Sequence, residues 1–175
     1  ILYDKETKKE ELYSNEKTGI NINIPPSITA IGDNAFANCD ALTEITIPGT
    51  VKTLGDYAFS GCDRLEKAVI SDGVEEIGNG AFSGCSSLID LTLPFAHGGT
   101  VESPFRLWYL FGGQNSNVPL IEKITVTGGD IIPNQAFMSL SNLKEVVLPD
   151  STTTINDMAF YDCNNLTKIN IPNSV

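Results

Sequence analysis

One short phrase recurs along the chain at a nearly constant interval. The pair Ala-Phe occurs five times, and neighbouring phenylalanines are 23 residues apart wherever no longer segment intervenes. The five phenylalanines are Phe36, Phe59, Phe82, Phe137 and Phe160. Self-similarity with a period between about 20 and 50 residues is typical of solenoids, in which each unit buries its apolar side only against its neighbours. The sequence therefore predicts a stacked array of coils rather than one globular core.

Each coil begins with an apolar-polar-apolar triplet rich in β-branched residues, which indicates a short strand. A proline follows the triplet in five coils, and proline is suited to a strand end because it lacks the amide hydrogen that a ladder needs. The inward-facing pairs are Ile22 and Ile24, Ile45 and Ile47, Ala68 and Ile70, Leu91 and Leu93, Ile124 and Val126, Val146 and Leu148, and Ile169 and Ile171.

The Ala-Phe segment of each coil predicts a single helical turn. A side-chain acceptor precedes it in every legible coil, at Asp33, Asp56, Asn79, Asn134 and Asp157, and acceptors at such a position favour N-caps. A metal-binding carboxylate ladder is the alternative interpretation, but two of the five residues are Asn. In three coils the residue before the acceptor is a glycine, which is suited to a tight bend. These glycines are Gly32, Gly55 and Gly78.

The four cysteines follow the same period. Cys39, Cys62 and Cys85 occupy one position, whereas Cys163 has Leu140 as its counterpart in the preceding coil. Stacked, equivalent Cβ vectors run parallel rather than towards each other, and an apolar residue substitutes at the position. We therefore expect free, buried thiols. The spacings do not match a Cys-x-x-Cys zinc site.

Charge and length exclude some classes of function. The chain has 175 residues, with 22 acidic and 11 basic side chains and a net charge of −11, so its field repels phosphate backbones and we expect no nucleic-acid partner. No apolar run approaches the roughly 20 residues that span a bilayer. Because the sequence starts at Ile1 and stops within a repeat at Val175, we expect it to be a fragment or a processed piece.

The regular period breaks once, where strand onsets at Leu91 and Ile124 lie 33 residues apart. Residues 94–120 contain the only His and the only Trp of the chain within an aromatic-rich segment. Insertions in one repeat are often where binding occurs, which makes Trp108 and Tyr109 candidate binding residues. The alternative is that these aromatics fill an enlarged coil, with Phe111 in the place of the missing phenylalanine.

The pattern Ile-Pro-x-x-Val-x-x-Ile-Gly-x-x-Ala-Phe-x-x-Cys-x-x-Leu-x-x-Ile resembles the leucine-rich repeat of BspA-like bacterial surface proteins, from Ile22 to Val175. Departures include Pro133 and Asn156 in place of Gly, and Leu140 in place of Cys. The resemblance implies an α/β right-handed leucine-rich-repeat solenoid with short parallel strands and single-turn helices. Residues 1–21 would form an N-terminal capping segment. Residues 22–175 would form the solenoid, with about six coils, the start of a seventh, and an enlarged coil at 91–123.

The resemblance also implies a location outside the cell, either on a bacterial surface or secreted, and adhesion to host, matrix or neighbouring-cell proteins. Stacked strands form an extended surface suited to protein recognition. Its candidate binding residues are the outward strand positions Thr46, Val69, Thr92, Thr125, Val147 and Asn170. A passive spacer or display scaffold for other domains is the alternative function.

The residues that flank this outward row alternate in sign, and such pairs stabilise neighbouring strands. They are Glu44, Lys67, Asp90, Lys123, Glu145 and Lys168. No Gly-x-Ser-x-Gly, His-Glu-x-x-His or phosphate-binding glycine loop is present in the sequence. We therefore expect no enzyme, no catalytic residues, no cofactor and no metal site.

Overall fold

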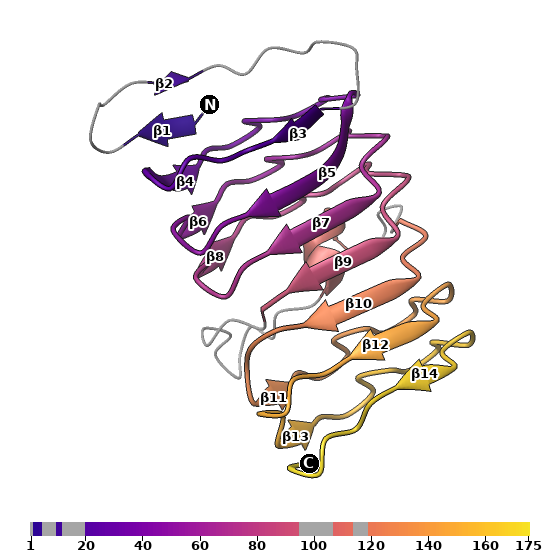
Figure 1. Ribbon diagram of the computed structural model, residues 1–175. Helices are drawn as coiled ribbons and strands as arrows, with labels where there is room; N and C mark the ends of the chain where they lie inside the picture. Colours follow the sequence, from indigo (N-terminus) through magenta and orange to yellow (C-terminus); the bar gives the residue numbers. More distant parts are fainter. Residues whose placement is uncertain (1, 5–9, 12–19, 95–106, 114–118) are drawn as a thin grey trace.

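The computed structural model describes residues 2–4, 10–11, 20–94, 107–113 and 119–175, and for residues 2–4, 10–11, 20, 21 and 108 it describes the backbone alone. Within these residues the chain winds as a parallel-strand β-solenoid (Figure 1). The main sheet has seven strands in the order β14-β12-β10-β9-β7-β5-β3. Their bounds are β3 Ile20–Ile22, β5 Leu42–Ile47, β7 Lys67–Ile70, β9 Asp90–Leu93, β10 Lys123–Val126, β12 Glu145–Val147 and β14 Lys168–Ile169.

A second parallel ladder accompanies the main sheet and was not predicted from the sequence. It is formed by the apolar positions that follow the turn after each main-sheet strand. Strands β4 (Ile28–Ile31), β6 (Thr53–Leu54) and β8 (Glu76–Ile77) pair in the first coils, and β11 (Ile131–Ile132) pairs with β13 (Thr154–Ile155) in the later ones. Strand β1 (Leu2–Asp4) pairs antiparallel with β2 (Glu10–Glu11) and with β4, so the start of the chain extends this ladder.

The predicted phenylalanine column is confirmed. The ring centroids of Phe36 and Phe59 lie 5.0 Å apart, those of Phe59 and Phe82 lie 5.4 Å apart, and both pairs are parallel to within 6°. Phe137 and Phe160 stack at 5.1 Å. Offset or stacked aromatic pairs add about 0.5–1.5 kcal/mol each beyond the burial of their area. This spine and the inward strand residues form one continuous apolar core.

The expected single-turn helices at Ala-Phe are not present. These segments are hydrogen-bonded turns, and in the described residues the helix is η1 (Leu107–Phe111), a 3-10 helix. The first coils show the reason, because Asn34 and Asn38 flank Phe36 with φ of 56° and 59°. Two left-handed residues four positions apart interrupt a right-handed helix. Later coils repeat the arrangement at Tyr57 and Gly61.

Amides in these turns alternate between two kinds of acceptor. The amides of Asn34, Phe36 and Asn38 donate to carbonyls of the next coil at 2.7–2.9 Å. The intervening amides of Ala35 and Ala37 donate to carbonyls three residues back in their own coil. The left-handed residues turn alternate amides outward, so that they reach carbonyls of the next coil instead of acceptors in their own. The turn is therefore a third line of hydrogen bonds along the stack.

The N-cap prediction is wrong for Asp33 and Asp56. Asp33 Oδ1 accepts a hydrogen bond from the amide of Asp56 at 2.8 Å, and Asp56 Oδ1 accepts one from the amide of Asn79 at 2.8 Å. Each carboxylate does bind a backbone amide, as expected for the residue type. The amide belongs to the neighbouring coil because no helical turn offers one within the same coil.

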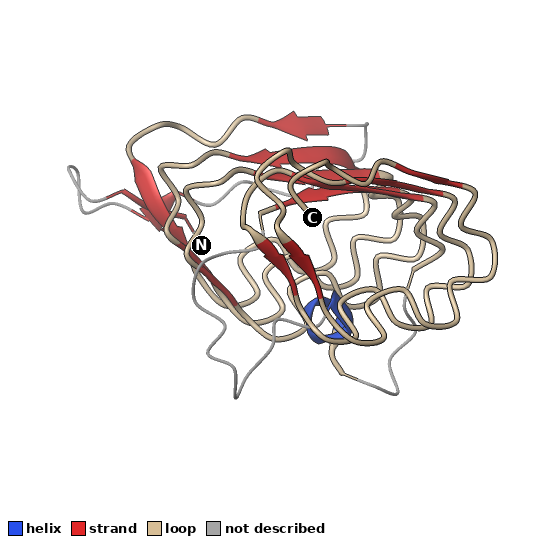
Figure 2. Cartoon of the chain, turned by 90° about the horizontal axis from the view of Figure 1, so that it is seen from below, coloured by secondary structure: helices blue, strands red, loops and turns tan. Residues whose placement is uncertain are grey.

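The enlarged coil keeps the stack continuous. The amides of Gly80 and Phe82 donate to the carbonyls of Tyr109 and Leu110 in η1 at 2.9 and 2.8 Å, and the amide of Leu107 donates to the carbonyl of Ala136 at 3.3 Å. Leu107, Leu110 and Phe111 are fully buried, which agrees with the interpretation that this segment fills the enlarged coil. Figure 2 shows η1 on the side of the coil opposite the main sheet. Residues 95–106, with His97, and residues 114–118 lie outside the described part of the chain.

Candidate protein-binding surface

The outward residues of the main sheet form one continuous row. The strands pair in register, so that Thr46 lies beside Val69, and Val69 beside Thr92. The enlarged coil does not interrupt the row, because β9 pairs directly with β10 and places Thr92 beside Thr125. Val147 follows on β12. Thr46 is exposed and the other four are half-buried, as expected for side chains standing on an open sheet face.

Asn170 ends this row in a different way. It lies just beyond β14, and its side-chain amide pairs with the backbone of Leu148: Oδ1 accepts from the Leu148 amide at 2.7 Å, and Nδ2 donates to the Leu148 carbonyl at 2.8 Å. The side chain thus supplies the pair of hydrogen bonds that another stretch of strand would supply. The sequence did not reveal this, because an Asn that faces solvent and an Asn that bonds to the neighbouring coil leave the same pattern.

The charged row beside it also follows the predicted register. Glu44 pairs with Lys67, Lys67 with Asp90, Asp90 with Lys123, and Lys123 with Glu145 as strand neighbours. Opposite charges therefore face each other across successive strands, which favours this register over a slipped one.

Glu145 and Lys168 form an ion pair at 2.7 Å at the end of this row. The hydrogen bond from Lys168 holds the pKa of the Glu145 carboxyl below its usual value. Both side chains are accessible to solvent, and exposed pairs of this kind contribute little to stability. The row is therefore more informative about what the surface can recognise than about what holds the sheet together.

The candidates in the enlarged coil are placed by η1. Tyr109 is 42% exposed, and its backbone carbonyl is bound to the amide of Gly80. The side chain of Trp108 lies outside the described residues. Because η1 lies opposite the main sheet, Tyr109 is not part of the outward row (Figure 2). Tyr109 and the outward row of the main sheet therefore lie on two separate surfaces.

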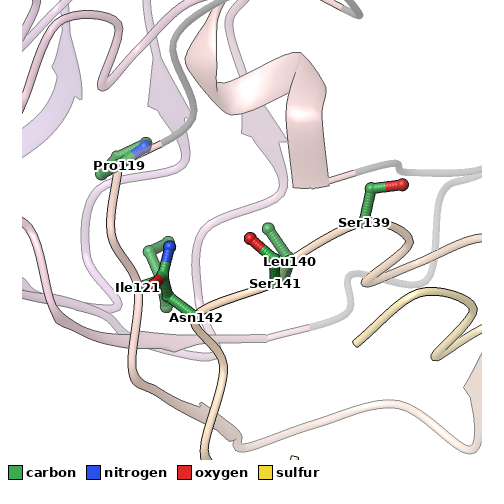
Figure 3. A pocket seen from close by; sticks show the side chains of 6 residues that line it. All are labelled: Pro119, Ile121, Ser139, Leu140, Ser141 and Asn142. Carbon is green, nitrogen blue, oxygen red and sulfur yellow. The ribbon is translucent and has the colours of Figure 1, made fainter. Parts of the chain in front are cut away.

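A small cavity lies where the coil after η1 meets the next coil. Pro119 and Ile121 form one wall, and residues 139–142 form the other (Figure 3). Its volume is about 50 Å³. Pockets that hold organic ligands usually measure about 300 to 1,000 Å³. This cavity has room for water and not for a substrate.

The cysteines are free thiols, as predicted, although Cys39 and Cys163 are half-buried rather than buried. Cys62 and Cys85 are buried, and their Sγ atoms donate to the carbonyls of Phe36 and Phe59 at 3.2 Å. Cys163 donates to the Phe137 carbonyl at 3.0 Å, and burial raises the pKa of its thiol. Hydrogen bonding with the thiol of Cys62 raises the pKa of Cys39. Thiolates are the reactive form, so the raised pKa values of Cys39 and Cys163 favour unreactive thiols at these two positions.

No group of three or more His, Cys, Asp or Glu side chains in the described residues is arranged to hold a metal ion. Within that same part of the chain, no helix has the length and apolar character required to cross a membrane.

Comparison with known families identifies the repeat. The family model for the BspA type leucine-rich repeat region matches in six copies, over residues 7–105 and 116–175. The chain belongs to the BspA-type leucine-rich repeat family. The match begins inside the segment 1–21 that the sequence assigned to a cap, and it continues through most of the enlarged coil. No curated protein matches the chain.

Several solved structures are similar to this BspA-type chain. A leucine-rich cell surface protein from Faecalibacterium prausnitzii is 24% identical, with a TM-score of 0.47 over 90% of this chain and 33% of its own. A leucine-rich repeat protein of T. pallidum is 26% identical, with a TM-score of 0.45 over 88% of this chain and 59% of its own. The pneumococcal vaccine antigen PcpA is 23% identical, with a TM-score of 0.37 over 99% of this chain and 54% of its own. The chain thus spans between a third and three-fifths of the length of these proteins.

Proposed function

We propose that this chain is a non-enzymatic, protein-binding module of a bacterial surface or secreted protein, and that the outward face of its main sheet is the binding surface. The continuous row from Thr46 to Val147 carries the proposal. It offers threonine hydroxyls and valine methyls at strand spacing, held in place by backbone ladders along the whole stack. A preorganised surface of this kind binds without paying the entropy of ordering a loop.

Membership in the BspA-type family supports a location outside the cell, where the ligand would be a host, matrix or neighbouring-cell protein. We further propose that residues 1–21 cap the first coil and that residues 22–175 form the solenoid, with an enlarged coil at 91–123. The antiparallel pairing of β1 with β4 supports a cap, because it covers the edge of the second ladder with a strand that does not continue the stack. Tyr109 and Trp108 would belong to a separate contact on the opposite side.

The function is tested by placing a bulky charge on the row. Thr92→Arg and Thr125→Arg introduce long side chains at the centre of the face, where no inward packing is disturbed. We expect binding to a panel of immobilised matrix and cell-surface proteins, measured by biolayer interferometry, to weaken at least tenfold. Thr154→Arg is the matched control, because Thr154 is an exposed threonine on β13 in the other ladder.

A passive spacer predicts a different result. The wild-type chain would then show no measurable affinity for any member of the panel, and the substitutions at Thr92 and Thr125 would change nothing. Equal losses for Thr92→Arg and Thr154→Arg would place binding elsewhere than the main sheet.

A further inference from the structure

We propose that the outward face of the main sheet also binds the same face of a second copy of this chain, about a two-fold axis that runs parallel to the strands. This inference rests on the proposed role of that face in protein binding, and it names one partner. Its basis is the order of side chains across the strands. When two copies face each other with the strand order reversed, each side chain meets one that complements it in charge or polarity.

The charged row shows this first. From β5 to β14 its six members alternate acidic and basic, and they keep this order in space because the strands pair in register. A two-fold axis parallel to the strands places the row opposite itself with the strand order reversed. Each position then meets a charge of the opposite sign. The facing pairs are Glu44 with Lys168, Lys67 with Glu145, and Asp90 with Lys123, each occurring twice.

The four central members of the uncharged row beside it are complementary under the same operation. Val69 faces Val147 of the second copy, and Thr92 faces Thr125. Methyl groups therefore meet methyl groups, and hydroxyl groups meet hydroxyl groups. Two sheets that pack face to face keep their strands aligned to within about 30° and lie about 10 Å apart, which this axis allows.

The charges also fix which strands face each other. Sliding one copy by a single strand brings Lys67 opposite Lys168 and Asp90 opposite Glu145, so that like charges meet. Juxtaposed like charges disfavour a wrong register strongly when they lose water. One arrangement of the two faces is therefore selected over its nearest neighbours.

The size of the face predicts a weak dimer. Six strands spaced about 4.8 Å apart, with about four residues each, give a projected area of about 400 Å² per copy. A standard stable interface buries about 800 Å² per partner. Each copy also carries a net charge of −11, which opposes association. We therefore expect a dissociation constant between about 10 and 500 μM, so that pairing matters where chains are crowded at a surface.

Two charge reversals test the arrangement. Lys123→Glu and Asp90→Lys each convert the central contact into two like-charge contacts in the dimer of that variant. We expect each variant alone to raise the dissociation constant at least tenfold in sedimentation velocity experiments. An equimolar mixture of the two variants restores both contacts in a heterodimer, so its affinity should return to within about threefold of the wild type. Each variant's circular dichroism and thermal unfolding confirm that it is folded.

Lys52→Glu is the matched control. Lys52 is an exposed lysine beyond the main sheet that pairs with Glu75 at 3.1 Å, and its reversal changes the net charge by the same amount as Lys123→Glu. It should leave self-association unchanged. A wild-type chain that is monomeric at about 500 μM, or a mixture that associates no better than its components, overturns the proposed dimer.

These results are separable from those of the binding panel. A chain that stays monomeric yet binds a matrix protein through Thr92 overturns the dimer and leaves the proposed function in place. A chain that forms the dimer and binds no other protein confines the face to self-association and overturns a foreign ligand.

Discussion

Thr152 shows how one residue can depart from the repeat at a measurable cost in stability. It is completely buried and occupies the position that Ile28, Val51 and Val74 fill in earlier coils. Its amide donates to the carbonyl of Pro149 as theirs do to the residue three positions back, yet its Oγ1 is the buried side-chain oxygen that lacks a hydrogen-bond partner within the described residues. Burying an unpaired hydroxyl costs about 1–3 kcal/mol.

We therefore expect Thr152→Val to raise the free energy of unfolding by about 1 kcal/mol, because valine has the same shape and removes the unpaired oxygen. Urea denaturation followed by circular dichroism measures it. The control is Thr153→Val, since the exposed Thr153 hydroxyl donates to the Asp130 carbonyl at 3.1 Å and should not gain from removal. Lower stability in Thr152→Val than in the wild type would show that the hydroxyl is satisfied in solution.

At the scale of elements, the turns set how closely the coils approach. Gly55 and Gly78 were expected to serve as bend residues, which would use the conformational freedom of glycine. The structure gives a different reason, because neither has a positive φ. A Cβ at Gly78 would lie 2.4 Å from the backbone nitrogen of Asp56, and one at Gly55 would lie 2.5 Å from that of Asp33. These glycines are needed for the close approach of one coil to the next.

Gly78→Ala should consequently lower the free energy of unfolding by about 2 kcal/mol, the range typical of overpacking, because backbone cannot move aside as a flexible side chain can. Thermal and urea unfolding provide the measurement. Gly128→Ala serves as the control, because its added Cβ would meet Asp72 at an ordinary contact distance of 3.5 Å. Similar stabilities for the two variants would mean that the backbone near Gly78 can shift to accommodate the added methyl group.

Across the whole molecule, the sequence predicted what repeats within each coil and missed what joins the coils. The phenylalanine column, the free thiols and most strand positions followed from residue type and period alone. Ile171, expected to face inward, lies beyond β14 and is 53% exposed. The second ladder and the turn hydrogen bonds did not, because the acceptors lie a full coil away in the sequence. Asp33 illustrates this: it was rightly expected to accept an amide, but only the stacked structure shows that the amide is that of Asp56. The candidate binding row was predicted by alternation, whereas the engagement of Asn170 depends on the strand beside it.

The enlarged coil is the place where coupling along the stack can be tested. A solenoid is stabilised by contacts between nearest neighbours, so weakening one coil should separate the parts on either side of it. Phe111 is fully buried in η1, which joins the turn at Phe82 to the turn at Ala136. We expect Phe111→Ala to cost about 3–5 kcal/mol. In native-state hydrogen exchange, the amides of β12 and β14 should lose protection before those of β5 and β7.

Tyr109→Ala is the matched control, because it removes an exposed aromatic ring from the same helix. It should leave the order of protection as in the wild type. The strands β9 and β10 remain paired in Phe111→Ala, so coupling through the main sheet competes with the loss at η1. A uniform decrease in protection over all strands would therefore show that the main sheet alone couples the two parts. A decrease confined to the C-terminal coils would instead show that the buried side chain of Phe111 holds the two parts of the array together.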